Sequence, residues 1–288
     1  MKNNKKIVLS LFLFFLFLGF KGIYTFFYYY ISCRGECGAN LPRVLSFMVG
    51  TALIYLSFRV WREESWRKVI PSSYIVSLAS SLYFLSLSGE GVWDILHPGS
   101  WHENWIPSYH EFGSYIIVIG YAFIAFILLY LALKLYRIKE NGVFNPEVFS
   151  LACYALFIYG LVVIYRSVFL LDLHFGAPSL YYDPGIVYIA FRFSLGVSLV
   201  LLLVAHKIKK SEEIPLLGIL SFYGLSAVVY NLMWARELCG LPGVGGEDIL
   251  LHLLPIFIGI VSITLALLIF SLETEETKRI LKKRYQIA

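Results

Sequence analysis

Charged residues are scarce in this sequence. They make up 15% of its 288 residues, while 59% are hydrophobic. Soluble domains average about a quarter charged and about half apolar residues. A soluble domain of this length needs more polar surface than this composition supplies. The composition therefore excludes an ordinary soluble protein and leaves no stretch long enough for a separate soluble domain.

Several motifs with a defined chemistry are also missing. The sequence has neither an H-E-x-x-H nor an H-x-x-E-H motif, and none of its four cysteines forms a C-x-x-C pair. These absences leave the common helical zinc motif and the usual thiol redox motif without support. The glycine-rich stretch "GLPGVGGED" follows no predicted strand, which excludes a dinucleotide-binding fingerprint.

Long apolar runs are what the sequence does contain. Each run is about 20 residues long, enough for one helix to cross a bilayer, and continuously apolar, unlike the alternating strands of a membrane barrel. We therefore expect an all-α, polytopic integral membrane helix bundle that forms a single domain over 1–288. The predicted spans are residues 7–31, 42–60, 70–88, 111–134, 147–171, 185–206, 214–235 and 250–272.

The basic residues predict the orientation of these spans. Cytoplasmic loops of membrane proteins carry an excess of lysine and arginine. Placing both termini in the cytoplasm puts a basic group at every inner loop and in the tail 273–288. The net charge of +5 therefore reflects the topology of the chain rather than nucleic-acid binding. The inner basic residues are Lys2, Lys5, Lys6, Arg59, Arg62, Arg67, Lys68, Lys134, Arg137, Lys139, Lys207, Lys209, Lys210, Lys278, Arg279, Lys282, Lys283 and Arg284.

The first apolar run raises the question of processing. "MKNNKK" followed by "IVLSLFLFFLFLGF" resembles a signal peptide, but no small-residue cleavage site follows and the run resumes after Lys21. We expect an uncleaved first helix and eight spans. Cleavage would leave seven spans with the same orientation.

One predicted outer loop, residues 89–110, is rich in histidine and tryptophan. Three of the six histidines and three of the six tryptophans lie between residues 93 and 110. Tryptophans are common at the membrane surface, where the indole lies in the interface. The imidazoles of His97, His102 and His110 are candidate ligands for a transition metal, which needs three such groups in a catalytic zinc site.

A second interpretation pairs His110 with His252. Both lie about one turn inside the outer ends of their predicted helices, so they share a membrane depth. Two facing imidazoles are able to ligate one haem axially. His206, the one histidine at an inner helix end, has no second imidazole there for an inner haem. His110 and His252 are therefore the candidate cofactor ligands.

Two arginines within the spans give the strongest indication of function. Arg166 lies about five residues from the outer end of the fifth span, and Arg192 about seven residues into the sixth. An arginine at the centre of a membrane helix costs about 2.5–3.5 kcal/mol on insertion scales, so it usually faces the bundle. Lys21 lies at a similar depth. Snorkelling to the interface, or ion pairs with Asp172, Glu237 or Asp248, are the structural alternatives.

These residues predict a site in the outer half of the bundle. Arg166, Arg192, His110 and His252 are the candidate catalytic residues, because arginine binds carboxylate or phosphate and histidine transfers protons. We expect a membrane-embedded enzyme or redox subunit that acts on an anionic, lipid or quinone-like substrate in the cell membrane.

Two other functional classes remain open. An anion or small-molecule transporter would use the same arginines, whereas the apparent lack of acidic residues within the spans disfavours proton or cation coupling. An assembly or sensory module would bind a partner through its outer loops or its basic tail. Cys33, Cys37 and Cys239 lie on the predicted outer side, where one structural disulfide is possible.

Overall fold

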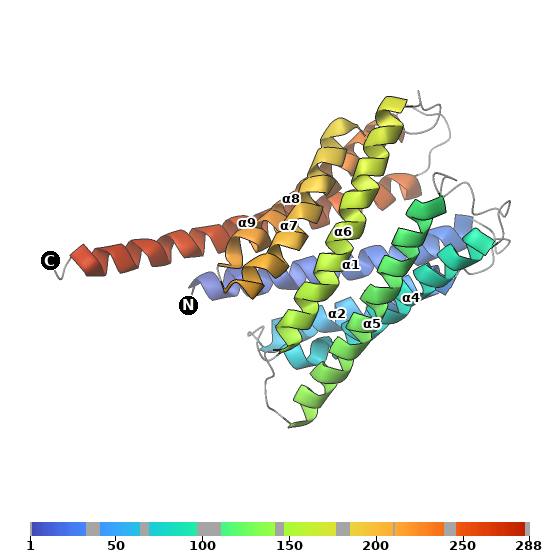
Figure 1. Ribbon diagram of the computed structural model, residues 1–288. Coiled ribbons are helices and arrows are strands. Elements are labelled where there is room, and N and C mark those ends of the chain that lie inside the picture. Colours follow the sequence, from blue (N-terminus) through green and yellow to red (C-terminus); the bar gives the residue numbers. More distant parts are fainter. Residues whose placement is uncertain are drawn as a thin grey trace.

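The structure is a computed structural model that describes residues 2–32, 41–63, 69–96, 111–141, 147–176, 185–209, 211–238 and 246–285. Every regular element in these ranges is helical, and eight of the helices are long and apolar enough to cross a membrane (Figure 1). The predicted all-α polytopic bundle is therefore confirmed. The helices are α1 (Lys2–Ser32), α2 (Leu41–Glu63), η1 (Ile70–Ser73), α4 (Tyr74–Leu96), α5 (Glu111–Asn141), α6 (Glu147–Gly176), α7 (Ile186–Lys207), α8 (Glu213–Leu238) and α9 (Gly246–Tyr285).

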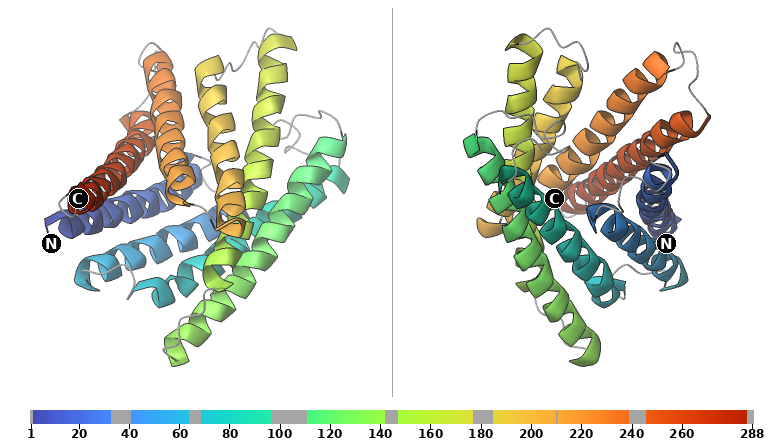
Figure 2. Two further views of the ribbon diagram at one scale, coloured as in Figure 1. Left: turned by 60° about the vertical axis from the view of Figure 1, so that its left-hand side comes forward. Right: turned by 90° about the vertical axis from the view of Figure 1, so that its right-hand side faces the viewer.

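The eight long helices form a closed ring. Each packs against the next one along the chain, and α9 returns to pack against α1. Their colours follow one another in sequence order around the right-hand view of Figure 2. Because successive helices run in opposite directions, both termini lie at one end of the bundle, which we call the terminal end (Figure 1). Beyond the bundle, α9 continues past this end as a projecting helix.

Three of the helix pairs cross at facing glycines. Without hydrophobic attraction between helices in lipid, small residues that permit close backbone contact are a main source of packing. A Cβ atom added to any of these glycines would lie 2.6–2.9 Å from the carbonyl oxygen of its partner. The pairs are Gly19 and Gly50 in α1 and α2, Gly160 and Gly196 in α6 and α7, and Gly224 and Gly259 in α8 and α9.

Serines join α4 to α5 instead. Three serine hydroxyls along one side of α4 donate hydrogen bonds to backbone carbonyls of α5, and such bonds hold membrane helices together where glycine is absent. The bonds run from Ser77 to Leu128 (2.8 Å), from Ser81 to Ala125 (2.7 Å) and from Ser88 to Val118 (3.0 Å).

The outward faces of the helices are apolar. Phe123, Phe126 and Leu133 on α5 and Phe58 on α2 are more than half exposed. Large exposed apolar surfaces on a protein mark contact with a partner or with lipid. On helices of this length they form the surface that lipid chains cover.

Candidate functional site

Arg192 is positioned by its own helix. Tyr188 lies one turn earlier in α7, and the Arg192 Nη1 atom donates a 2.7 Å hydrogen bond to the Tyr188 hydroxyl. The guanidinium carbon also lies 5.6 Å from the centre of the Tyr188 ring. The Nε atom of Arg192 is buried and has no hydrogen-bond partner among the described residues. One tyrosine therefore satisfies only part of a group with five N–H donors.

Arg166 is held by a tyrosine of the neighbouring helix. Its Nη1 atom in α6 donates a 3.1 Å hydrogen bond to the Tyr121 hydroxyl in α5. The Tyr121 ring packs against Phe84 of α4, with ring centres 5.6 Å apart. The Arg166 side chain itself is exposed. Arg166 thus links α5 and α6 and remains accessible from outside the packed helices.

The two arginines share a set of tyrosines. Both interact electrostatically with Tyr121 and with Tyr188, and Arg192 also interacts with Tyr159 of α6. The structure therefore brings together Arg166 and Arg192, which the sequence predicted as site residues.

Lys21 brings a third positive charge from the opposite side of the ring. It lies in α1, and its ammonium group is close enough to Arg192 for the two like charges to interact. In the ring, α1 neighbours α2 and α9 but not α7, so this interaction crosses the interior. We call the group formed by Lys21, Arg166, Arg192, Tyr121, Tyr159 and Tyr188 the cationic cluster.

Aromatic contacts support the interior position of this cluster. The Tyr159 ring of α6 packs against Phe84 of α4 at 6.1 Å, and Tyr223 of α8 packs against Phe14 of α1 at 6.4 Å. Neither pair of helices is adjacent in the ring. Tyr223 also interacts with Arg192. Side chains from six helices thus meet inside the bundle.

Glu90 corrects one prediction from the sequence. The apolar run predicts a third span that ends at residue 88, with no acidic residue in the interior of any span. The span of the structure covers Ile70–Trp93 and includes Glu90, because α4 continues through "SGEGVWDIL" to Leu96. Glu90 interacts with Tyr83, which also interacts with Tyr121 and Arg166. Among the side chains that the structure describes, Glu90 is thus the one carboxylate that interacts with these tyrosines, beside three basic side chains.

His252, in α9, contacts two side chains of α8. Its Nδ1 atom is 2.9 Å from the Asn231 side-chain oxygen, and its ring stacks on Trp234 with an interplanar angle of 6°. Both contacts go to α8. An Nδ1–H group donated to an amide oxygen would fix the tautomer whose Nε2 carries the lone pair, as second-shell bonds do for metal-ligating histidines. His252 is thus suited to a proton-transfer or ligand role.

The three predicted metal ligands, and His110 of the predicted haem pair, lie outside the described ranges. His97, His102 and His110 lie beyond the described ranges, as do Cys33, Cys37 and Cys239. Within the described part of the chain, no group of three histidine, cysteine or acidic side chains has the geometry to hold a metal ion. The side chains of Asp172, Glu237 and Asp248 are also undescribed, so the ion-pair alternative for the arginines stays a prediction.

The tyrosines are the part of the site that the sequence did not reveal. Five of them, one or more from each of α4 to α8, surround the two arginines. A tyrosine has an apolar ring and one hydroxyl, so it does not interrupt an apolar run as arginine does. The one signal in the sequence is helical spacing, since Tyr188 precedes Arg192 by four residues. These tyrosines are Tyr83, Tyr121, Tyr159, Tyr188 and Tyr223.

The fold and the cluster together define a polytopic helical membrane protein with basic side chains in the interior of a ring of helices. Comparisons with protein-family models, with curated proteins and with solved structures found no match.

Proposed function

We propose that this protein is a membrane-embedded enzyme that binds the anionic group of its substrate at the cationic cluster. The observation that carries the proposal is the pair of like charges, Lys21 and Arg192, that interact within the ring. No described carboxylate forms an ion pair with either residue. Uncompensated charge within a membrane is costly, and an anionic ligand would offset that cost.

The donors of the cluster fit carboxylate or phosphate. A guanidinium presents parallel N–H groups that match two oxygens of such an anion, and hydrogen bonds to ionised groups are about twice as strong as neutral ones. Arg192 retains a buried Nε–H group without a described acceptor, and tyrosine hydroxyls supply further donors. Arg166 is exposed, which gives the anion a route to the cluster. A lipid phosphate fits this set best, and a quinone carbonyl would use fewer of its donors.

His252 is the candidate for proton transfer in this proposal. Asn231 holds its ring through Nδ1, and histidine changes protonation state near neutral pH. A transition metal or haem shared by His110 and His252 remains part of the proposal, as does a metal at His97, His102 and His110. Metal analysis of the purified protein and its absorption near the haem Soret band test both cofactors directly.

Binding measurements test the anion site. The full-length protein in detergent is titrated with short-chain phosphatidic acid, with inorganic phosphate and with a short-chain quinone. We expect the phosphatidic acid to bind and Arg192→Gln to weaken it by about 10- to 100-fold, the loss expected for a hydrogen bond to a charged group. Arg137→Gln, an exposed arginine at the terminal end, is the matched control. Equal affinity in the two variants, or no binding of any ligand, contradicts the proposal.

An anion transporter is the second candidate. The observation that favours it is the closed ring around the cationic cluster, because a path for an anion to either face of the membrane would run along the interior of such a ring. Uptake of phosphate into vesicles that contain the protein distinguishes the two functions. Uptake that Arg192→Gln abolishes favours transport, and binding of phosphatidic acid without uptake favours the enzyme.

The orientation in the cell membrane is also part of the proposal. The positive-inside rule places the terminal end in the cytoplasm. The cationic cluster, in the opposite half of the bundle, then lies in the outer leaflet. Its substrate would accordingly come from outer-leaflet lipid or from the external solution.

A further inference from the structure

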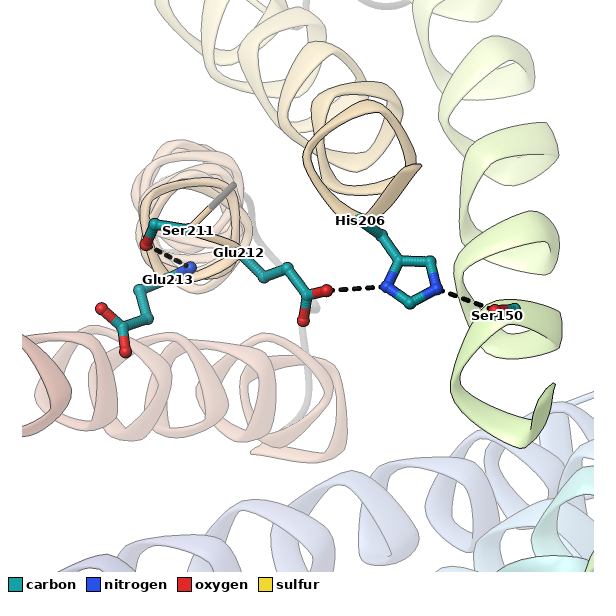
Figure 3. A network of polar contacts seen from close by, with 5 residues as sticks. All are labelled: Ser150, His206, Ser211, Glu212 and Glu213. Atoms are coloured by element: carbon teal, nitrogen blue, oxygen red, sulfur yellow. Dashed lines mark hydrogen bonds and ion pairs between the residues drawn. The ribbon is translucent and has the colours of Figure 1, made fainter. Parts of the chain in front are cut away.

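A second polar site lies at the terminal end of the bundle. The Ser150 hydroxyl oxygen in α6 is 2.7 Å from Nε2 of His206, and Nδ1 of the same ring is 2.7 Å from an Oε1 atom of Glu212 (Figure 3). Figure 3 shows the imidazole at the end of α7 between the serine of α6 and the carboxylate before α8. We infer that Ser150, His206 and Glu212 form a serine–histidine–glutamate triad that cleaves carboxylic esters by acyl transfer.

The hydrogen bonds of His206 give its two ring nitrogens the roles that such a triad requires. A carboxylate only accepts hydrogen bonds, so the Glu212 contact places the proton of a neutral imidazole on Nδ1. Nε2 then carries the lone pair and accepts the proton of the Ser150 hydroxyl. This is the arrangement in which histidine removes the proton of a nucleophilic serine while the acid fixes its tautomer.

Ser150 differs from other serines of the spans. Serines in membrane helices usually donate to a backbone carbonyl one turn earlier or on a neighbouring helix. Ser57 and Ser167 donate within their helices to Ile54 and Val163, and Ser81 donates to Ala125 of α5. The hydroxyl of Ser150 contacts an imidazole from a different helix instead. Its hydroxyl is therefore directed at a base rather than at a backbone carbonyl.

The turn before α8 brings Glu212 back to His206. Lys209 has a φ of 52°, in the left-handed region that side-chain-bearing residues seldom adopt. The Ser211 hydroxyl accepts a 3.3 Å hydrogen bond from the Glu213 N–H group (Figure 3). The Glu212 carbonyl accepts one of 3.1 Å from the Leu216 N–H group. A left-handed residue at this place, just after the end of α7, is a common helix cap. The turn returns the chain so that the Glu212 carboxylate lies 2.7 Å from the imidazole.

The surroundings indicate an amphiphilic ester as the substrate. The side chains of His206 and Glu212 are 23% and 32% exposed, so a substrate reaches them from the membrane surface. Beneath the triad lies an apolar cluster of Cys153, Leu202 and Leu203 from the same helices. Those side chains are buried, so an acyl chain would lie against Phe149, which is 37% exposed and packs edge-on to the His206 ring, while its ester group reaches Ser150.

The reaction balances with water as the second reactant. The Ser150 oxygen forms a bond to the acyl carbon, its proton moves to Nε2 of His206, and the departing alcohol takes that proton as the ester bond breaks. Water then attacks the acyl-serine and gives one proton to Nε2. The bond between the acyl carbon and the Ser150 oxygen breaks, the carboxylic acid leaves, and the serine oxygen takes that proton back from Nε2. The first turn of α6, which holds Ser150, has N–H groups without acceptors in the helix, and such groups stabilise a developing oxyanion.

A covalent probe tests the nucleophile. The full-length protein in detergent is treated with a fluorophosphonate, and the labelled residue is located by peptide mass spectrometry. We expect labelling of Ser150. His206→Gln should lower the labelling rate at least about 100-fold, because a general base contributes that much. Glu212→Gln should also lower the labelling rate. Ser167→Ala, on the same helix, should label normally.

Two results would overturn the triad. Wild-type protein that stays unlabelled at Ser150 shows that the hydroxyl is not a nucleophile, whatever the variants do. Equal labelling of the wild type and the folded His206→Gln variant shows that the imidazole does not activate it. Hydrolysis of p-nitrophenyl decanoate faster than the acetate supports an amphiphilic ester, and the reverse order rejects that substrate class. None of these measurements depends on the cationic cluster, which lies in the other half of the bundle.

Discussion

At the scale of single residues, the hydrogen bond between Arg192 and Tyr188 sets the first prediction. Tyr188→Phe removes the one described acceptor of a guanidinium whose Nε atom is already buried and unpaired. Loss of a hydrogen bond to a charged buried group costs about 1–3 kcal/mol. We expect a lower thermal unfolding midpoint for this variant in detergent. The control is Tyr55→Phe, at an exposed position, which should unfold at the same temperature as the wild type. If both variants have the same unfolding midpoint, Tyr188 does not support the arginine.

Lys21 leads to a prediction of opposite sign. Its charge interacts with the like charge of Arg192, so removal by Lys21→Met relieves repulsion as well as the cost of a charge within a span. Without ligand, we expect Lys21→Met to raise the unfolding midpoint, while affinity for phosphatidic acid falls. Lys21→Arg, which keeps the charge, should leave both the unfolding midpoint and the affinity for phosphatidic acid near those of the wild type. A decrease in stability for Lys21→Met would mean that Lys21 has a structural partner instead.

The sequence revealed the charged residues of the cluster but not their partners. Arg166, Arg192 and Lys21 were visible because a charge within a 20-residue apolar run is rare. With 21 tyrosines spread along the chain, the composition gives no reason to choose Tyr121 or Tyr159. The triad was hidden for a related reason, since serine and glutamate are common at helix ends and only folding brings Ser150, 56 residues away, to His206.

At the scale of helices, the facing glycines set the spacing of three pairs. In Gly196→Ala, the added Cβ atom would lie 2.7 Å from the Ile164 side chain and 2.9 Å from the Gly160 carbonyl oxygen. Such overpacking costs about 1–3 kcal/mol, so we expect a lower unfolding midpoint. The control is Gly89→Ala, whose Cβ atom meets nothing within 4 Å. The better helix propensity of alanine should leave that variant as stable as the wild type or more so.

The helices themselves follow from the sequence more directly than their contacts do. Length and hydropathy suffice to predict a membrane helix, because lipid offers backbone groups no alternative partner. The pairing of Gly160 with Gly196 depends on the rotation of two helices about their axes. Apolar faces on all sides leave that rotation undetermined, since lipid and protein interior are equally apolar. The contacts of α4 with α5 through serines were hidden in the same way.

At the scale of the whole molecule, contact between α1 and α9 closes the ring. The Phe17 and Phe257 rings stack with centres 6.1 Å apart. In a background without the four native cysteines, Phe17→Cys with Phe257→Cys should cross-link with a short bis-maleimide in native membranes. Phe17→Cys with Phe126→Cys, on the outward face of α5, should not. Cross-linking of the second pair instead of the first would rule out the ring order, and electrophoretic mobility reports both results.

Topology reporters test the proposed orientation of the bundle. A fluorescent protein fused after residue 288 should be bright in the cytoplasm, because basic residues gather at the terminal end. Alkaline phosphatase inserted near Trp101 should be active, since that enzyme folds only outside the cytoplasm. A dark fluorescent fusion combined with an inactive phosphatase would reverse the orientation and place the cationic cluster in the inner leaflet.

The closed ring also constrains biogenesis. The ribosome makes α1 first and α9 last, so α1 waits for its second neighbour until nearly the whole chain has been translated. During that time Lys21 has been threaded into the bilayer while Arg192 and the later helices are still absent. A nascent chain interrupted before residue 246 would leave one flank of α1 uncovered, which is the kind of defect that quality-control proteases recognise.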